Sequence, residues 1–414
     1  MSNVSINNKN TEENLRKLSI ALLLFSVPLQ SFTLIFGVSV YEIVSLLVFI
    51  ISIFLVFNYQ EVTFWRKHLT TLLLFLLFTI FYSLSKIAHE EILNIIQFLF
   101  WSFSFLYALI IYRPLALNAF LWPVLWGVVI MVTVAVGHQF DIIPLFDFER
   151  IATFRESNYK GFTGLISSRG AYGIWLITGL MSTFLLFFLA NSKAKKILTI
   201  AIAFLIIYGV VITFSRSTWV AAIIFILVFS FFKIFTRNVV LSGERFPLFA
   251  IAITMSFAIF IVLIFSGLIG NLIEAVVNIR KSSVDIRLTT YLEGLSIIKD
   301  LNLLGADASK LQRVIHNAYI AILVELGYPA LVLFILLNLS IAYWLVKCIL
   351  RLSSMRRTIA IIAFSGFLAV QVELNLFRGY ESITYWAFLS QIVILLRYLR
   401  TPIATGKKYN LVNP

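Results

Sequence analysis

The sequence predicts an all-α, polytopic integral membrane protein with about twelve transmembrane helices. Of its 414 residues, 61% are hydrophobic and 13% are charged, against roughly 45–50% and 25% in soluble domains. Apolar runs of about 18 to 24 residues recur along the chain, and each is long enough to cross roughly 30 Å of hydrocarbon as a helix. The runs are continuous rather than alternating, which excludes a membrane β-barrel.

The apolar runs define the individual spans. A polar, Asn-rich segment, 1–17, precedes them, and we expect it to stay attached because no small-residue cleavage site follows the first run. The predicted spans are 18–36, 38–57, 69–86, 91–111, 115–137, 168–190, 197–214, 217–235, 247–268, 318–346, 358–374 and 383–399.

These spans divide the chain into seven segments. They are a cytoplasmic N-terminus (1–17), a five-helix region (18–137), an outer loop (138–167), helices six to nine (168–268), a large outer loop (269–317), helices ten to twelve (318–399) and a cytoplasmic tail (400–414). Long ordered loops tend to carry function, which directs attention to the two outer loops.

The charges follow the positive-inside rule. The net charge is +14, from 33 Lys and Arg against 19 Asp and Glu. With the N-terminus inside, the predicted topology leaves roughly +16 on the cytoplasmic side and roughly −2 outside. This distribution predicts a multi-pass protein of the bacterial inner (plasma) membrane with both termini in the cytoplasm. The basic clusters are then topology signals and contacts for anionic membrane lipids, and no nucleic-acid partner is expected.

Arg169 and Arg216 are among the arginines predicted on the outer side, against this bias. The stretch 197–232 is nearly twice the length of one span and contains a single charge, Arg216, so the chain must turn there. We expect Arg216 at the outer mouth of a tight hairpin, because an arginine at mid-membrane is costly. Arg169 opens the sixth span from the same side, and Gly170 and Gly173 permit close helix approach there.

The large outer loop is predicted to be partly helical. Its apolar positions, which recur at helical spacing after a possible cap at Asp285, are Ile286, Leu288, Leu292, Leu295 and Ile298. An amphipathic helix with this pattern lies at a membrane interface. It would carry Arg287 and, one turn later, Tyr291; the pair His316 and Asn317 follows before the tenth span.

Arg169, Arg216, Arg287 and His316 are therefore predicted to converge on one face of the membrane. A single outer arginine is also explained by headgroup anchoring, and a single histidine by interfacial hydrogen bonding, so the interpretation depends on the convergence. No two histidines have the spacing of a metal site and the loop carboxylates follow no ligand interval, so no metal is expected. No Gly-rich phosphate loop is present, and no cofactor is expected.

Four motifs over about 169–345 resemble the O-antigen ligase and O-antigen polymerase superfamily. They are SSRGAYGIWLITGL, TFSRSTWVAAIIFILVF, DIRLTTYLEGLSIIKDLNLLGA and HNAYIAILVELGYPALVLFILL. The resemblance implies a membrane glycosyltransferase on the periplasmic side. Such an enzyme transfers a glycan from a polyprenyl (undecaprenyl) diphosphate donor to an acceptor hydroxyl, with inversion and without metal. The acceptor is a lipid A-core glycan for a ligase or a second lipid-linked repeat for a polymerase, and the sequence leaves that choice open.

The resemblance, together with the chemistry of the side chains, suggests a role for each residue. Arg216 and Arg287 would bind the departing diphosphate, with Arg169 as a third guanidinium. His316 would accept the proton of the acceptor hydroxyl. Asn317 would orient a sugar or cap the tenth helix, and Tyr291 would stack on a sugar or anchor the loop.

The alternative is a transporter or flippase of lipid-linked saccharides. Transporters usually carry ionisable groups near mid-membrane and have related halves. This chain has no convincing internal repeat, and Glu42, Glu325 and Glu373 lie toward the outer ends of their spans. The sequence names no partner for Glu325, which needs one if it faces the bundle.

Overall fold

The structure, a computed structural model, is all-α over the residues that it describes. These are 2–33, 38–58, 69–110, 117–144, 162–166, 168–213, 215–235, 289–290, 292–293, 296, 303–306, 315–352, 354–375 and 377–401. Within them, the β-structure is one isolated bridge between Thr33 and Ser39.

Among the described residues, eight helices are long and apolar enough to span a membrane. They are α3 (Leu69–Ala88), α4 (Ile92–Ile110), α5 (Asn118–Gln139), α7 (Arg169–Leu189), α8 (Lys193–Ile212), α9 (Arg216–Phe235), α12 (Ala318–Arg351) and α13 (Ser354–Leu374). The chain is therefore a multi-pass helical membrane protein, as predicted. The predicted span 247–268 lies outside the described residues.

Three further long helices complete the described bundle. They are α1 (Ser2–Ser26), α2 (Val40–Asn58) and α14 (Ile383–Arg400). α1 begins within the segment predicted as a polar N-terminus and gives way to a 3-10 helix, Val27–Ser31, at Pro28. Proline cannot continue an α-helix because it lacks the N–H and clashes with the preceding turn. The first helix is thus shifted toward the N-terminus relative to the predicted span 18–36.

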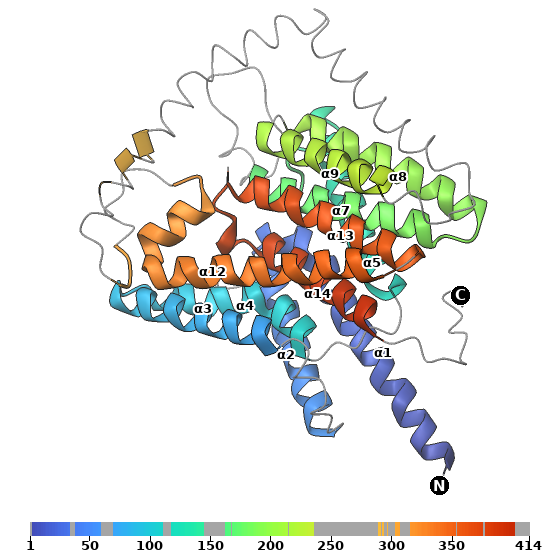
Figure 1. Ribbon diagram of the computed structural model, residues 1–414, viewed down its shortest axis with the longest axis horizontal. Helices are drawn as coiled ribbons and strands as arrows, with labels where there is room; N and C mark the ends of the chain where they lie inside the picture. Colours follow the sequence, from blue (N-terminus) through green and yellow to red (C-terminus); the bar gives the residue numbers. More distant parts are fainter. Residues whose placement is uncertain are drawn as a thin grey trace, which may run out of the picture.

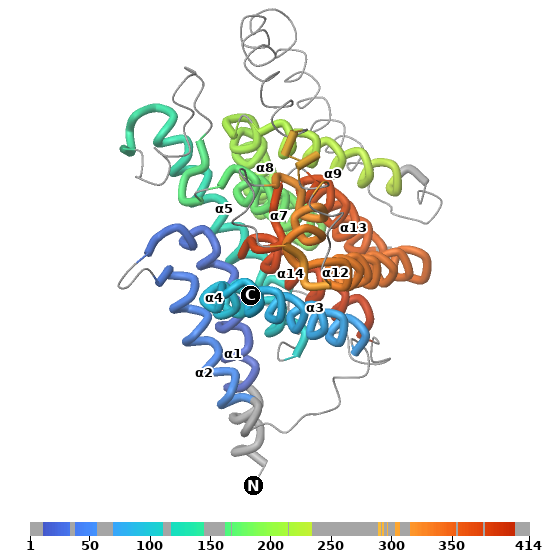
Figure 2. The backbone as a smooth tube through the Cα atoms, turned by 90° about the vertical axis from the view of Figure 1, so that its left-hand side faces the viewer, coloured from blue at the N-terminus to red at the C-terminus, as the bar shows by residue number. Residues whose placement is uncertain are grey.

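The centre of the molecule is formed by α7, α13 and α14. α7 is buried over most of its length and packs against α5, α8, α9, α13 and α14. Figure 2 shows α7 and α14 in the middle of the molecule, while α1 and α2 run side by side at its lower edge. On the other flank α12 lies against both α3 and α13, as Figure 1 shows.

A buried arginine holds α14 against α4. The Arg397 guanidinium donates to the carbonyl oxygens of Ala108 and of Leu109, the latter at 3.1 Å. These carbonyls belong to the last turn of α4, where backbone oxygens have no partner within the helix. A cation there also interacts favourably with the negative end of the helix dipole. Arg397 is therefore accommodated inside the bundle by capping a neighbouring helix.

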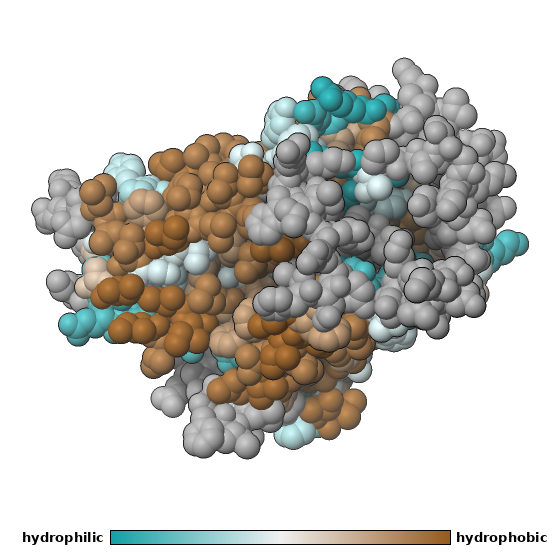
Figure 3. Space-filling view, turned by 90° about the horizontal axis from the view of Figure 1, so that it is seen from below, coloured by the Kyte–Doolittle hydropathy of each residue, from teal (hydrophilic) through white to brown (hydrophobic). Residues whose placement is uncertain are grey.

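The outer surface of the bundle is apolar where lipid would contact it. Figure 3, seen from below, shows large hydrophobic patches at the left and centre of the molecule, with smaller polar patches between them. On α2 and α3 the exposed apolar residues include Leu46, Phe49, Ile50, Ile53, Leu69, Leu73, Leu76, Leu77, Ile80, Leu84 and Ile87. Most of these recur every three or four residues, which defines one stripe per helix. A soluble monomer does not expose so large an apolar area.

Residues 303–306, a described part of the predicted large outer loop, pack on the first turns of α12. The backbone N–H of Ala306 donates to the carbonyl of Val324 at 2.6 Å. Gly327 has φ +85° and ψ 177°, which kinks α12, and a Cβ there would lie 2.3 Å from the Leu303 oxygen. Only glycine adopts this backbone conformation without strain. Residues 289–290, 292–293 and 296 of the predicted loop helix are also helical.

Candidate functional site

Three helices begin at the same end of the bundle, around the point where α13 ends. α9 reaches this point through Ser217 and Thr218, which donate to Glu373 near the end of α13. α12 reaches it through Asn317, whose amide donates to the carbonyl of Asn375 at 2.9 Å. α7 reaches it at Gly170, where an added Cβ would lie 2.2 Å from the Phe377 ring.

Glu373 joins α7, α9 and α13. Its carboxylate is fully buried and accepts hydrogen bonds from the hydroxyls of Ser217, at 2.8 Å, and Thr218, at 3.3 Å. α7 comes close because it presents Gly173, where a Cβ would lie 2.3 Å from Thr218 Oγ1 and 3.0 Å from Glu373 Oε1. The expected close approach at Gly170 and Gly173 is thus present, and a buried carboxylate fixes it.

Arg169 and Arg216 are the first residues of α7 and α9. Arg169 is partly buried, whereas Arg216 is exposed. α8 ends at Ile212 and α9 begins at Arg216, so the hairpin predicted at this position is short. Helix N-termini present unpaired backbone N–H groups and the positive end of the helix dipole, and both features favour an anion.

Asn317 is the N-cap of α12. Its side-chain oxygen accepts hydrogen bonds from the backbone N–H groups of Tyr319, at 2.9 Å, and Ile320, at 3.0 Å. The capping role considered for Asn317 from the sequence is thereby confirmed. His316, one residue earlier, is exposed at the same end of α12.

A chain of buried and partly buried polar side chains fixes the start of α12 against α13 and α14. The Tyr319 hydroxyl donates to Gln371 Oε1 at 2.5 Å, and the Gln371 amide donates to Asn338 Oδ1 at 2.9 Å. The Tyr385 hydroxyl donates to the same Asn338 oxygen at 2.8 Å. Fully satisfied networks of this kind select one relative position of the helices. The position of His316 therefore follows from contacts made deeper in the bundle.

Arg287 and Tyr291 lie outside the described residues. Of the site residues predicted from the sequence, the structure thus describes Arg169, Arg216, His316 and Asn317. Their neighbours Gly170, Ser217 and Asn317 itself contact one short segment, 373–377.

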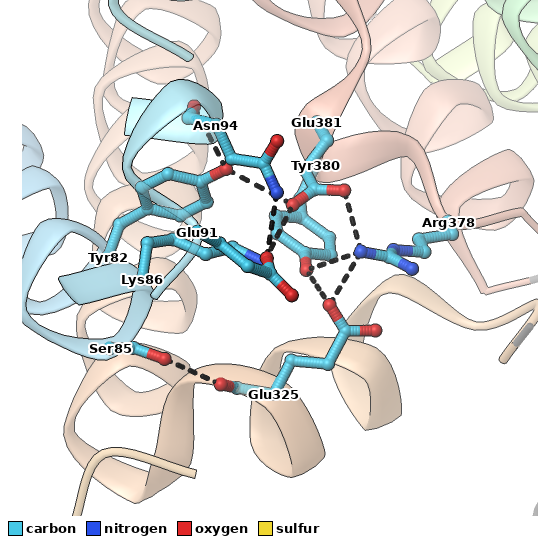
Figure 4. A network of polar contacts seen from close by, with 9 residues as sticks. All are labelled: Tyr82, Ser85, Lys86, Glu91, Asn94, Glu325, Arg378, Tyr380 and Glu381. Atoms are coloured by element: carbon cyan, nitrogen blue, oxygen red, sulfur yellow. Dashed lines mark hydrogen bonds and ion pairs between the residues drawn. The ribbon is translucent and has the colours of Figure 1, made fainter. Parts of the chain in front are cut away.

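A second cluster of charges lies at the same end and includes the partner of Glu325. Figure 4 shows Arg378 between two carboxylates, with its Nη2 atom 2.6 Å from Glu325 Oε2 and 2.7 Å from Glu381 Oε2. The Tyr380 hydroxyl donates to Glu325 Oε2 at 2.7 Å. The Glu325 side chain is 2% exposed. A charge buried to this degree requires such partners.

The α3–α4 turn supplies the other half of this cluster. Lys86 lies 2.6 Å from Glu91 and 3.9 Å from Glu381. The Tyr82 hydroxyl donates to Glu381 Oε1 at 3.2 Å, and the Asn94 amide donates to Glu91 at 2.7 Å. The cluster therefore joins the α3–α4 turn and α12 to the α13–α14 connection (Figure 4).

The charges shift one another's ionisation. Burial alone lowers the pKa of Arg378, but Tyr380, Glu381 and Glu325 outweigh it, so the pKa lies above its usual value. Burial raises the pKa of Glu91, and Lys86 more than offsets this, so that pKa lies below its ordinary value. Both groups are therefore charged at neutral pH.

Arg378 is not among the residues predicted from the sequence, although the sequence contains a signal for it. Arg378 shares the feature that marked Arg169 and Arg216, which is an arginine on the predicted outer side against the positive-inside bias. It stands in the short connection between the last two predicted spans. Attention to this feature would also have supplied a partner for Glu325.

Among the described residues, no group of three or more His, Cys, Asp or Glu side chains could hold a metal ion. No protein-family model matches the chain, and no curated protein sequence matches it either.

Proposed function

We propose that this chain is an O-antigen ligase- or polymerase-type glycosyltransferase of the bacterial inner membrane. Its donor would be a glycan on polyprenyl diphosphate and its acceptor a hydroxyl of lipid A-core or of a second lipid-linked repeat. In this proposal the chain has twelve spans and its termini are cytoplasmic. The end of the bundle that bears Arg169, Arg216 and His316 then faces the periplasm.

One observation carries the proposal: the first residues of α7, α9 and α12 gather around the end of α13. A polyprenyl diphosphate leaves with two to three negative charges, which a partly dehydrated site must stabilise. Two helix N-termini bearing Arg169 and Arg216 supply positive charge and N–H donors, and guanidinium groups bind diphosphate oxygens bidentately. Arg287 is proposed as a third guanidinium on the motif resemblance alone.

The proposed reaction is a single displacement. The acceptor oxygen attacks the anomeric carbon as the bond from that carbon to the diphosphate oxygen breaks, and the polyprenyl diphosphate departs with the bonding electrons. His316 accepts the hydroxyl proton, since an imidazole with pKa near 6.5 suits that task at neutral pH. One attack from the opposite face inverts the anomeric centre. Asn317 and Tyr291 are proposed to contact sugar in addition to any structural role.

The test uses full-length protein in proteoliposomes that contain an undecaprenyl-diphosphate-linked glycan and an acceptor glycolipid. His316→Ala should lower transfer by about 10²-fold or more, whereas His89→Ala, a change at another predicted outer histidine, should not. Arg216→Met should lower transfer by about 10²-fold. Full transfer by His316→Ala would remove it from the site. Strong inhibition by EDTA that magnesium reverses would contradict a metal-free reaction.

Two further results separate the alternatives. Movement of the lipid-linked glycan across the bilayer in the absence of acceptor, without transfer in its presence, would identify a transporter or flippase instead. In a deletion strain, full-length chains retained on polyprenyl diphosphate would indicate a ligase. Single repeats on the lipid A-core would indicate a polymerase.

A further inference from the structure

A basic cavity lies at the end of the bundle opposite the candidate site. It has a volume of about 490 Å³ and lies between the last turns of α12, the first turn of α13 and the end of α14. Among the described residues, its lining includes the cations Lys347, Arg351, Arg356 and Arg400 and no acidic side chain. Four positive charges facing one cavity repel one another, and a bound anion would relieve that repulsion.

Helix capping accounts for only some of these cations. Arg356 donates to the carbonyl oxygen of Thr401 at 2.9 Å, just past the end of α14. Lys347 and Arg351 near the end of α12, and Arg400 at the end of α14, complement the negative ends of their helix dipoles. Neither effect requires the cations of two helix ends to face a common cavity.

An aromatic ring forms part of the cavity wall. The Arg400 guanidinium carbon lies 3.7 Å from the centre of the Trp344 ring, and the Lys347 ammonium lies 4.5 Å from it. A cation over the face of a tryptophan ring is attracted to that ring. Tryptophan is enriched where lipid headgroups meet the hydrocarbon. The cavity therefore has the composition of a headgroup-level site.

The surface next to the cavity is a continuous apolar stripe of α12. Its exposed members recur every three or four residues and end one residue before Arg351; they are Leu336, Leu339, Tyr343, Val346 and Leu350. The last of these is 74% exposed. A ligand with a phosphate in the cavity and acyl chains along this stripe would both neutralise the basic cavity and cover the apolar stripe. A free phosphate would only neutralise the cavity.

We propose that this cavity binds the phosphate headgroup of an anionic glycerophospholipid, with the acyl chains along the apolar stripe of α12. Basic cavities between helices at the cytoplasmic surface suit anionic headgroups, and the acyl chains of such a lipid supply affinity that the phosphate alone lacks. The site is independent of the proposed transfer reaction, because it lies at the other end of α12.

The experiment titrates purified full-length protein, in a zwitterionic detergent, with palmitoyl-oleoyl phosphatidylglycerol and counts bound lipid by native mass spectrometry. Phosphatidylcholine with the same chains and sn-glycerol 3-phosphate without chains are the comparison ligands. Both should bind at least about tenfold more weakly than phosphatidylglycerol. Equal binding of phosphatidylcholine, or equal binding of glycerol 3-phosphate, would overturn the proposal.

A charge-matched pair of variants locates the site. Arg351→Gln combined with Arg400→Gln should weaken phosphatidylglycerol binding by about 25-fold, from about fivefold per charge. Lys193→Gln combined with Lys195→Gln removes two charges at the same end of the bundle, outside the cavity, and should change binding less than about threefold. Equal losses in the two double variants would refute the location.

A charge-conserving variant distinguishes the loss of positive charge from a loss of folding. Arg351→Lys combined with Arg400→Lys should keep binding within about fivefold of the wild type, because the headgroup phosphate needs positive charge more than a guanidinium fork. The thermal midpoint of each variant without added lipid reports its folding. Loss of binding by a folded lysine variant would contradict a site built on these two charges.

Discussion

The strongest stability prediction concerns Arg378, whose removal would leave a carboxylate buried without its cation. In Arg378→Met, Glu325 keeps the Tyr380 hydroxyl as a donor but loses the guanidinium 2.6 Å away. Breaking a buried ion pair from one side costs about 3–5 kcal/mol. We expect the low end, about 3 kcal/mol, because the Arg378 side chain is 23% exposed and Tyr380 remains.

The assay is equilibrium unfolding of the purified full-length protein in mixed detergent micelles, with Lys17→Met as the matched control. Lys17 forms a surface ion pair with Glu13 in which the side chains are 33% and 34% exposed. Such a pair contributes about 0.2–1 kcal/mol. Adding Glu325→Gln to Arg378→Met should recover about half of the lost stability, because the uncompensated charge disappears. An Arg378→Met cost no larger than that of Lys17→Met would refute the reasoning.

Three other changes have defined outcomes. The pKa of Glu91 lies below its ordinary value because of Lys86, so the ionised carboxylate stabilises the folded protein at neutral pH, and this contribution is lost as pH falls below about 4.5. The unfolding free energy measured against pH should therefore decrease below that pH, and Glu91→Gln should remove this contribution to the decrease. Asn317→Ala should cost about 1 kcal/mol of unfolding free energy, while Asn317→Ser, which keeps a capping oxygen and puts no second oxygen against the Asn375 carbonyl, should cost less. Gly173→Ala should cost about 1–3 kcal/mol by pushing against Thr218, and a neutral result in unfolding would argue against that close contact.

Helix positions were predictable because hydrophobic length is a local property. The predicted spans 69–86 and 217–235 correspond to α3, Leu69–Ala88, and α9, Arg216–Phe235. The first span was displaced because hydropathy does not detect the polar start of α1 and because Pro28 ends that helix early. α12 continues past its predicted end at 346 to Arg351, since basic side chains extend a helix into the interface.

The candidate site was predictable in part. Short polar interruptions between apolar runs marked Arg216, and the pair His316 and Asn317 was identifiable as the entrance to a span. The involvement of Glu373 as an acceptor for Ser217 and Thr218 was not, because those residues are more than 150 positions apart. The ion pair between Lys86 and Glu381 was not predictable either, because those residues are also far apart in the sequence.

By itself, the sequence determined that this chain is a bundle of membrane helices and where most of the described helices begin and end. The membrane spans follow from transfer free energies summed residue by residue along the chain, so they can be predicted without knowing which helices pack together. Only the tertiary structure decided that Arg378 neutralises Glu325, 53 residues away, and that the ends of α12, α13 and α14 enclose a basic cavity. Such contacts depend on the rotation and depth of each helix relative to the others, which packing and buried polar bonds set together.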